Sequence, residues 1–288
     1  MRIGALEAGG TKMVLAVGNE EGKIFDRRTI PTRTPEETMP EIIRYFQGQH
    51  IASLGVACFG PIDLNRKSET YGSILMTPKL AWRHYDILGT LGNALHVPMA
   101  FDTDVNGSAV GEHRFGAAKD VDSCVYITIG TGIGIGVIAD GKPLHGALHP
   151  EGGHIMMGKK PGDDFKCICP NHDCCFEGMA SGPAIEKRWG MKAYELSDRP
   201  EVWETESWYI AQAIVDYIMI LSPQRIILGG GVMKQTQLFP MICAKVKEMI
   251  HGYLVMPELD DIEHYIVSPG CGDDQGILGC IAMAAELL

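Results

Sequence analysis

The sequence predicts an α/β protein built from two similar lobes. Apolar, strand-like runs alternate with helical runs along the chain, which is typical of α/β architecture. A strand, a glycine–threonine turn, a second strand and a turn containing Gly-Lys occur near the N-terminus and occur again from residue 124. No low-complexity linker separates the halves. We therefore expect a small N-terminal lobe of residues 1–115 and a large C-terminal lobe of residues 116–288, with a last helix that can return to the small lobe.

Composition excludes several classes of protein. The 288 residues are 45% hydrophobic, which is too apolar for a disordered chain. No apolar run approaches the roughly 18 residues that a membrane span needs, and the N-terminus does not resemble a signal peptide. The net charge of −11 argues against binding to nucleic acid. Nine cysteines without an export signal favour thiols or metal ligands in the cytoplasm over disulfides.

The first half has a clear order of predicted elements. A helix is expected to run to about Gln47 because Thr34 supplies a hydroxyl cap, Pro35 suits the first helical position, and two glutamates follow at the positive end of the dipole. A second helix is expected over residues 106–115. The predicted strands cover residues 2–7, 13–17, 23–30, 53–59 and 97–101.

The second half repeats the alternation. Apolar residues at helical spacing predict a helix near 208–221, and two further helices are expected, one ending near residue 250 and one running from 274 to the C-terminus. The predicted strands cover residues 124–129, 133–139, 225–228 and 265–267. Gly130, Gly132, Gly134 and Gly136 have the period of a strand, so we expect one strand face of bare backbone that a ligand or another strand can approach.

Three glycine-rich turns follow predicted strands, and each could hold phosphate. They are Gly9-Gly10-Thr11, Gly130-Thr131-Gly132 and Gly229-Gly230-Gly231. Glycine lets backbone N–H groups face an anion, and Lys12 adds a positive charge. A single such turn is as well explained by an ordinary hairpin, but three are harder to dismiss. Neither a P-loop nor a full dinucleotide-binding glycine motif is present. The remaining interpretation is a nucleoside triphosphate held in an interlobe cleft, as in the actin-like, hexokinase-like (ribonuclease H-like) fold.

Two carboxylates stand where a strand meets a helix. Asp102 and Asp104 lie at the carboxyl end of a predicted strand, the usual ligand-binding edge of an open α/β sheet. Strand alternation would place them on opposite faces, so we expect only one of them to meet a substrate. Asp104 is the candidate, either as a helix cap or as the general base of a phosphoryl transfer from Mg²⁺-bound ATP to a sugar hydroxyl.

A dense group of metal-ligand residues occurs at 167–175. Its core is Cys169-x2-His172-x2-Cys175, a clustering that favours Zn²⁺ in a cytoplasmic chain. A fourth ligand is needed for a closed structural site. His154 is the nearest upstream candidate, and the competing candidates are His145, His149, Cys167 and Cys174.

Taken together, these motifs resemble the ROK family of sugar kinases and repressors across essentially the whole chain. The matching motifs are, in order, Leu6-Glu7-Ala8-Gly9-Gly10-Thr11-Lys12, Gly60-Pro61-Ile62, Asp102-Thr103-Asp104-Val105-Asn106, Gly130-Thr131-Gly132-Ile133-Gly134, Glu151-Gly152-Gly153-His154 and Leu228-Gly229-Gly230-Gly231-Val232. Residues 7–12 and 169–184 resemble the zinc-containing bacterial fructokinases within that family.

The resemblance implies ATP-dependent phosphorylation of a hexose, with fructose the leading substrate, by a homodimer that binds ATP, Mg²⁺ and a structural Zn²⁺. It implies Asp104 as the catalytic base. The implied sugar contacts are Gly60, Pro61, Asn106, Glu151, His154 and Glu177. The implied ATP contacts are Gly9, Gly10, Thr11, Lys12, Thr131, Gly132, Pro183, Gly231, Val232, Met233, Lys234 and Gln235. The implied metal ligands are His154, Cys169, His172 and Cys175.

Some positions depart from the common family pattern. Glucokinase-like members have asparagine where this chain has Thr103, which weakens an assignment to glucose. Glu7 replaces an aspartate often seen at that position, so a role toward Mg²⁺ would run through water. Kinases for mannose, glucose or another hexose, a sugar-binding regulator and an actin-like ATPase remain alternatives. The regulator is disfavoured because the first predicted strand begins at residue 2, which leaves no room for a helix-turn-helix.

Overall fold

The computed structural model describes residues 1–288, and the chain forms two compact units. The first unit contains residues 1–120, 136–150 and 270–288, and the second contains residues 121–135 and 151–269. The first segment ends five residues beyond the lobe boundary expected at residue 115. The units also differ from a single split there, because the segments 136–150 and 270–288 pack with the N-terminal part of the chain.

Each unit has its own set of elements. The first unit contains β1 (Ile3–Ala8), β2 (Lys12–Gly18), β3 (Ile24–Pro31), α1 (Pro35–Gln47), β4 (Ser53–Cys58), η1 (Leu80–Trp82), α2 (Ile87–Leu95), β5 (Met99–Thr103), α3 (Asp104–Phe115), β8 (Lys142–Pro143), η5 (Gly272–Asp274) and α10 (Gln275–Ala285). The second contains β6 (Cys124–Ile129), η2 (Gly152–His154), α4 (Phe176–Ala180), α5 (Gly182–Trp189), η3 (Ala193–Glu195), α6 (Pro200–Leu221), β9 (Arg225–Gly229), η4 (Val232–Lys234), α7 (Leu238–Ile250), α8 (Pro257–Asp260), α9 (Ile262–Tyr265) and β10 (Ile266–Val267). β7 (Ile133–Ala139) begins in the second unit and ends in the first.

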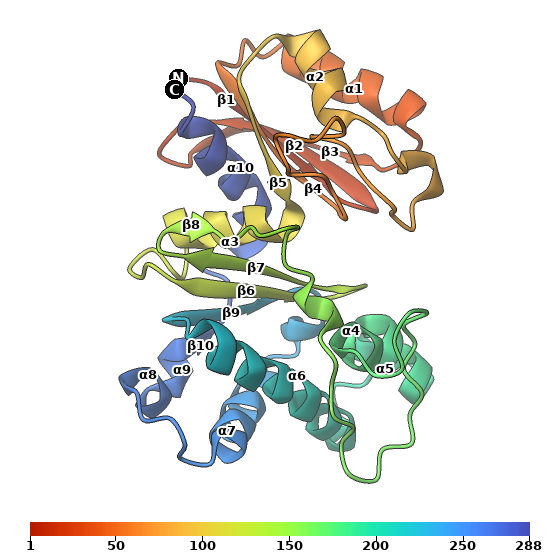
Figure 1. The fold of residues 1–288 in the computed structure, drawn as a ribbon, viewed down its shortest axis with the longest axis vertical. Helices are drawn as coiled ribbons and strands as arrows, with labels where there is room; N and C mark the ends of the chain where they lie inside the picture. Colours follow the sequence, from red (N-terminus) through yellow and green to blue (C-terminus); the bar gives the residue numbers. More distant parts are fainter. The chain divides into compact units, whose positions relative to one another are not determined.

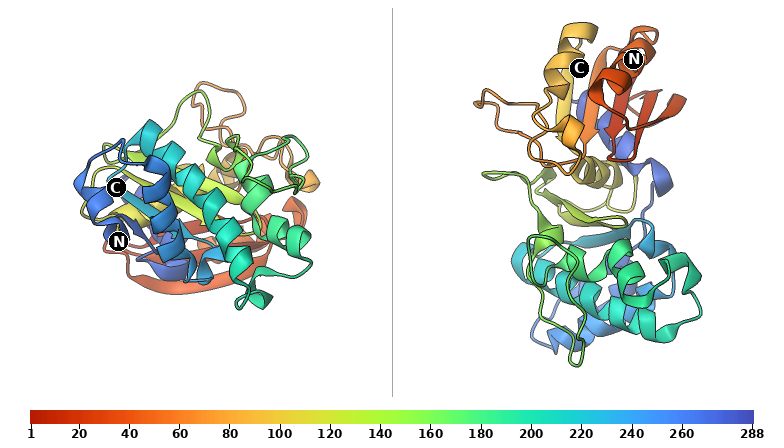
Figure 2. Two further views of the ribbon diagram at one scale, coloured as in Figure 1. Left: turned by 90° about the horizontal axis from the view of Figure 1, so that it is seen from below. Right: turned by 90° about the vertical axis from the view of Figure 1, so that its right-hand side faces the viewer.

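The first sheet has the strand order β3-β2-β1-β4-β5, with α1 and α2 on one face and α10 on the other (Figure 1). Alternate residues of β1 divide between two cores, since Leu6 packs with Ile42 and Leu91 on one side while Ala5 packs with Ile281 on the other. The C-terminal helix α10 also lies against β1 and β4, so both termini belong to this unit (Figures 1 and 2).

Helices α3 and α10 approach each other closely because both carry glycine at the contact. A Cβ atom placed on Gly279 would lie 1.7 Å from the Gly107 carbonyl oxygen, and one on Gly107 would lie 2.7 Å from the Ala57 Cβ. Any side chain at Gly279 would therefore push the helices apart. This contact fixes α3, and with it the end of β5, against the first sheet.

A buried carboxylate ties distant parts of the first unit together. The Glu112 side chain on α3 is fully buried and accepts hydrogen bonds from the backbone N–H groups of Ala117 (2.7 Å), Gly270 (2.8 Å) and Cys271 (2.9 Å). Three donors satisfy a carboxylate that would otherwise be very costly to bury. The segments that it joins lie next to the points where the chain enters and leaves the second unit.

The second sheet has the order β10-β9-β6-β7-β8, in which β9 runs parallel to both β6 and β10. In the second unit α6 and α7 pack against each other, and α7 also contacts β10 (Figure 1). No helix combines the length and the apolar character that a membrane crossing requires.

Several predicted boundaries are wrong. α6 begins at Pro200 rather than near residue 208. The sequence of its first two turns is mostly polar and shows no clear apolar pattern, but Val202 and Trp203 are buried in the structure and extend the helix. The glycine triplet is followed by the short turn η4, and α7 begins only at Leu238. The predicted strand at 265–267 is limited to Ile266–Val267, because Tyr265 ends α9. Helices α2, α4, α5, α8 and α9 are not among the predicted elements.

The period-two glycine run also behaves differently from the prediction. Only Gly134 and Gly136 lie in β7, while Gly130 and Gly132 belong to the turn before it. A turn breaks the alternation of faces, so the four glycines do not form one bare strand face.

Candidate functional site

The first glycine turn joins β1 to β2 and is held by the neighbouring strand. The Gly9 N–H donates to the Lys12 carbonyl at 3.1 Å, and the Thr32 hydroxyl donates to the Gly9 carbonyl at 2.6 Å. Thr32 N–H also donates to the Thr11 carbonyl. Thr11 and Lys12 are exposed, so the turn can offer a hydroxyl and an ammonium group to an anion.

Glu7 lies in β1, just before this turn, and is partly buried. Burial raises the pKa of its carboxyl, and the charges of Lys12 and Arg27 oppose that rise. Asp273 and Asp274 add negative charge near it. A group of carboxylates with Lys12 close by is compatible with a hydrated divalent cation.

The junction of β5 and α3 fixes Asp104. Thr103 is the N-cap of α3, and its hydroxyl accepts the Asn106 N–H at 3.1 Å. Asp104 is therefore the first helical residue, and the alternative that it caps the helix is wrong. Its carboxylate accepts the Val105 N–H at 2.9 Å and is half-buried. The helix begins at Asp104, two residues before the predicted start, because Thr103 supplies the cap.

Asp102 lies at the end of β5 and binds three groups. One carboxylate oxygen accepts from the Asn106 side-chain amide and from the Thr103 N–H, both at 2.7 Å. The other oxygen lies 2.8 Å from Nε2 of His145. Asp102 and Asn106 are almost fully buried, whereas 41% of the His145 side chain is exposed.

The Gly60-Pro61 turn follows β4, and its peptide bond is cis. The next residue, Ile62, donates its N–H to Nε2 of the buried His149 at 3.3 Å, and the Pro61 carbonyl accepts the Leu75 N–H at 2.8 Å. The competing metal ligands His145 and His149 thus bind groups of the first unit.

The second glycine turn joins β6 to β7 and is held by the Glu177 side chain and by the start of α5. The Gly130 N–H donates to the Gly132 carbonyl at 2.9 Å, and the Gly130 carbonyl accepts the Gly182 N–H at 2.8 Å. The Ile133 N–H donates to Oε2 of Glu177 at 2.9 Å. Thr131 is exposed, and Pro183 follows Gly182 at the start of α5, so the turn and this helix N-terminus lie together.

The third glycine turn, after β9, lies beside the second. A Cβ on Gly130 would lie 3.7 Å from the Gly231 nitrogen, and Gly230 has a φ of +90°. Gly231 and Lys234 are exposed, whereas Val232 and Met233 are buried. Gln235 donates to the Ala193 carbonyl at 3.3 Å.

Four predicted metal ligands come together in the second unit. The candidate ligand atoms of His154, Cys169, His172 and Cys175 all lie within 4.8 Å of one another. Nδ1 of His172 lies 3.3 Å from Sγ of Cys169, and Nδ1 of His154 lies 3.7 Å from Sγ of Cys175. Two thiols and two imidazoles at this spacing suit a tetrahedral Zn²⁺ site. Cys167 and Cys174 are outside the group.

Glu177 links this cluster to the second glycine turn. Its Oε1 lies 3.9 Å from Nε2 of His154, while its Oε2 accepts the Ile133 N–H. A ligating histidine usually has its second ring nitrogen held by a carboxylate or carbonyl. The Nδ1 atom of His154 therefore faces the thiol of Cys175, a metal candidate, and its Nε2 atom faces Glu177, a sugar candidate.

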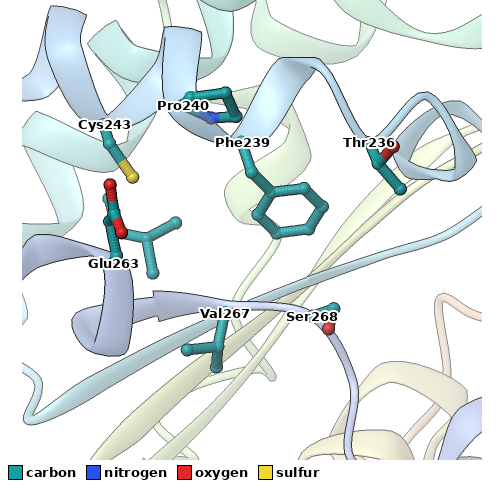
Figure 3. Close-up of a pocket in the computed structure, with 8 residues that line it drawn as sticks. Thr236, Phe239, Pro240, Cys243, Glu263, Val267 and Ser268 are labelled. Carbon is teal, nitrogen blue, oxygen red and sulfur yellow. The ribbon is translucent and has the colours of Figure 1, made fainter.

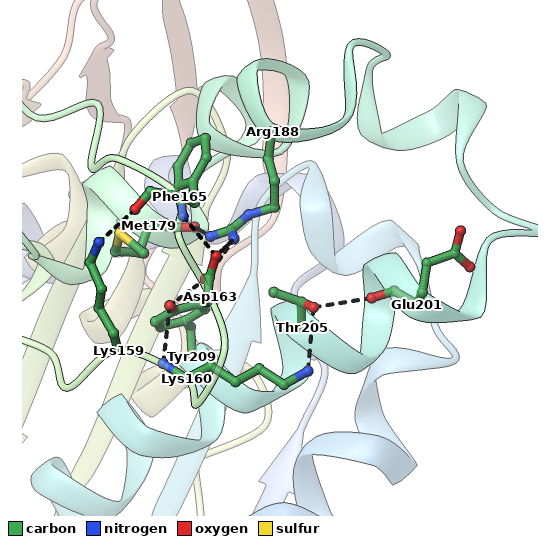
Figure 4. A network of polar contacts seen from close by, with 9 residues as sticks. All are labelled: Lys159, Lys160, Asp163, Phe165, Met179, Arg188, Glu201, Thr205 and Tyr209. Atoms are coloured by element: carbon green, nitrogen blue, oxygen red, sulfur yellow. Dashed lines mark hydrogen bonds and ion pairs between the residues drawn. The ribbon is translucent and has the colours of Figure 1, made fainter.

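A polar network anchors the segment that leads into the cluster. Arg188 forms an ion pair with Asp163 at 2.6 Å and stacks over Phe165, with the guanidinium carbon 4.0 Å from the ring centre (Figure 4). The Tyr209 hydroxyl donates to the same carboxylate. Burial alone would raise the pKa of Asp163, but the hydrogen bonds from Arg188 and Tyr209 hold it below its usual value. The network fixes residues 159–165 against α5 and α6.

The second unit also contains a pocket of about 450 Å³ near β10 and the start of α7, lined by residues such as Phe239, Cys243 and Glu263 (Figure 3). It includes none of the predicted site residues. The candidates for the sugar are divided, with Gly60, Pro61 and Asn106 in the first unit and Glu151, His154 and Glu177 in the second. Residues 9–12 of the ATP set belong to the first unit, and the remaining ATP candidates to the second.

The strand-end position singles out Asp102 as well as Asp104, but the sequence predicts a role for Asp104 alone. His145 and His149 are predicted only as metal candidates. No local pattern reveals the histidines, because their partners lie far away in the sequence.

Comparisons with known proteins agree with these features. The model of the ROK family matches residues 3–286. A fructokinase of Pediococcus pentosaceus is 46% identical over 100% of this chain and 99% of its own length, and a fructokinase of Streptococcus mutans is 39% identical over 99% and 97%. The structure of a ROK hexokinase from Thermus thermophilus has a TM-score of 0.83 at 22% identity, covering 100% of this chain and 99% of its own. This likeness confirms the predicted fold class.

Proposed function

This chain belongs to the ROK family, and we propose that it is an ATP-dependent hexose kinase that converts D-fructose to fructose 6-phosphate. The observation that carries the proposed chemistry is the junction of β5 and α3. Thr103 is the N-cap of α3, so the Asp104 carboxylate, at the first helical position, does not cap the helix. The full-length similarity to fructokinases supports fructose as the substrate.

Asp104 acts as the general base. It accepts the proton of the C6 hydroxyl as the hydroxyl oxygen attacks the γ-phosphorus of ATP, and ADP leaves. The residues proposed to contact the sugar are Gly60, Pro61, Asn106, Glu151, His154 and Glu177. A sugar bound by several hydrogen bonds loses rotational freedom, so its reacting hydroxyl is presented to the base in a fixed orientation.

The glycine turns hold ATP. Gly9, Gly10, Thr11 and Lys12 offer N–H groups, a hydroxyl and a positive charge, and Thr131 with Gly132 offers a second set beside the start of α5 at Pro183. The nucleoside part of ATP contacts the segment from Gly231 to Gln235. Mg²⁺ neutralises charge on the phosphates when ATP is bound, and Glu7 would hold it through water.

The four-residue cluster binds a structural Zn²⁺ through His154, Cys169, His172 and Cys175. Two thiolates and two imidazoles would supply the four ligands of a structural Zn²⁺ and would leave no open position for catalysis. Its chemistry is therefore to fix the segment 154–175 and, through His154, the carboxylate of Glu177. We expect the enzyme to work as a homodimer in the cytoplasm, where thiols stay reduced.

The substitution Asp104→Asn tests the catalytic role. It keeps the shape of the side chain but removes the base, so kcat should fall by roughly 10²- to 10⁴-fold while the dissociation constant for fructose stays within about threefold. Steady-state kinetics and calorimetric titration with fructose measure the two quantities. Asp198→Asn, at an exposed position, is the matched control. Near-normal turnover by Asp104→Asn would contradict the assignment.

A further inference from the structure

Asn106 carries a buried acceptor with no partner. Its side chain is 1% exposed, and Nδ2 donates to Asp102 Oδ1 at 2.7 Å. That bond fixes the amide so that Oδ1 points away from Asp102, and this oxygen has no hydrogen-bond partner in the protein. Leaving a buried carbonyl oxygen unpaired is unfavourable, so such an atom in a native structure calls for an explanation.

His145 stands beside this acceptor as a donor. Its Nε2 lies 2.8 Å from Asp102 Oδ2 and 3.4 Å from Asn106 Nδ2. A carboxylate only accepts, so Nε2 carries the hydrogen. The hydrogen bond to Asp102 raises the pKa of His145 against the opposing effect of burial, and Asp102 is the charged group that faces the ring. The other ring nitrogen, Nδ1, makes no hydrogen bond to the protein. Because 41% of the side chain is exposed, this nitrogen is available to a ligand.

Thr103 cannot fill this role. It immediately precedes Asp104, but it is 3% exposed and its hydroxyl is used as the cap of α3. The Asn106 oxygen and the His145 ring are therefore polar groups near the start of α3 that are not used up by the protein's own hydrogen bonds.

We propose that Asn106 and His145 each bind a hydroxyl of the sugar, and that Asp102 is the positioning residue that orients both. One hydroxyl donates to Asn106 Oδ1, and another forms a hydrogen bond with Nδ1 of His145. A sugar that lacks the second hydroxyl leaves this nitrogen unpaired, so the site rejects it. This inference rests on the proposed function, since it names a further specificity residue of the same sugar site.

The test measures kcat and KM of wild type, His145→Gln and Asp102→Asn with D-fructose and with analogues that each lack one hydroxyl. The analogues are 1-deoxy-, 3-deoxy- and 4-deoxy-D-fructose and 2,5-anhydro-D-mannitol. His264→Gln is the matched control, because His264 forms a similar pair with Asp261 at 2.7 Å but belongs to no proposed site.

With fructose, His145→Gln should raise KM by roughly 10- to 100-fold and change kcat and the KM for ATP by less than about threefold. Asp102→Asn should raise the KM for fructose at least as much. With one of the four analogues the wild type should itself have a raised KM, and the penalty of His145→Gln should disappear. His264→Gln should match the wild type throughout.

An equal penalty with every analogue would show a merely structural role and overturn the inference, as would an unchanged KM in His145→Gln. Failure of the proposed function gives a different result, because the wild type itself would then phosphorylate none of these sugars. Because His145 is partly exposed, His145→Gln should fold, and a melting curve checks this.

Discussion

The two units join distant segments of the chain by different chemistry. In the first unit the buried Glu112 carboxylate binds three backbone N–H groups from residues 117, 270 and 271. In the second unit the thiols and imidazoles of the Cys/His cluster gather residues 154, 169, 172 and 175. Equivalent tasks are thus performed by a hydrogen-bonded carboxylate in one unit and by a group of thiols and imidazoles in the other.

The glycine turns show the same contrast. The first is held by the Thr32 hydroxyl and backbone of the adjacent strand, whereas the second is held by Glu177, which also faces a ligand of the cluster. Loss of the metal should therefore disturb the second turn and spare the first.

The largest expected effect is that of removing a metal ligand. Cys169→Ser should abolish the one Zn²⁺ per chain, because apparent binding energies of structural zinc are on the order of 10 kcal/mol and depend on the complete ligand set. Elemental analysis measures the zinc content. Hydrogen exchange should show lower protection of the Ile133 amide, in the second glycine turn, and unchanged protection of the Gly9 amide, in the first. Cys167→Ser, outside the four-residue set, is the control. Full zinc content in Cys169→Ser, or its loss in Cys167→Ser, would refute the ligand assignment.

A smaller effect is expected from Glu112→Gln in the first unit. Replacing one carboxylate oxygen by an NH₂ group sets a donor against backbone donors, so the free energy of unfolding should fall by about 2–4 kcal/mol. Urea denaturation measures the change, with the exposed Glu286→Gln as control. Zinc content should remain complete. A variant as stable as the control would show that this carboxylate does not hold the unit together.

Glu177→Gln should have a more local effect. The amide can still accept from Ile133, but it carries no charge, so the bond should weaken by about 1 kcal/mol. Hydrogen exchange should then show roughly fivefold lower protection at Ile133 and none of this change at Gly9. The exposed Glu186→Gln, on α5, is the control. Unchanged protection at Ile133 would show that the charge of Glu177 does not stabilise the turn.

The smallest effect concerns pH. The Asp102 hydrogen bond raises the folded-state pKa of His145 above its unfolded value of about 6.5, so its stabilising contribution is complete below that pH and is lost as pH rises through the folded pKa. The partly exposed pair should contribute only a few tenths of a kcal/mol. The Tm difference between wild type and His145→Gln should therefore be larger at pH 6 than at pH 8.5. A Tm difference that is larger at pH 8.5 than at pH 6 would contradict the raised pKa of His145.

Local patterns in the sequence predicted the strand–helix alternation, the glycine turns and the Cys/His cluster, because each depends mainly on residues close together in the chain. The spacing of Cys169, His172 and Cys175 is of this kind, and His154 completes the group as expected. The roles of Glu112 and His145 could not be predicted, since their partners come from segments joined only by tertiary packing. The start of α6 was missed for a related reason, because burial of Val202 and Trp203 stabilises turns whose sequence is mostly polar.

The most direct test of the account is a coupled ADP-release assay with Mg-ATP over a panel of fructose, mannose, glucose and N-acetylated hexosamines. The proposal predicts the highest kcat/KM with D-fructose and fructose 6-phosphate as the product. A higher kcat/KM with another hexose would contradict the assigned substrate, and no sugar-dependent ADP release from any hexose would contradict the kinase activity itself.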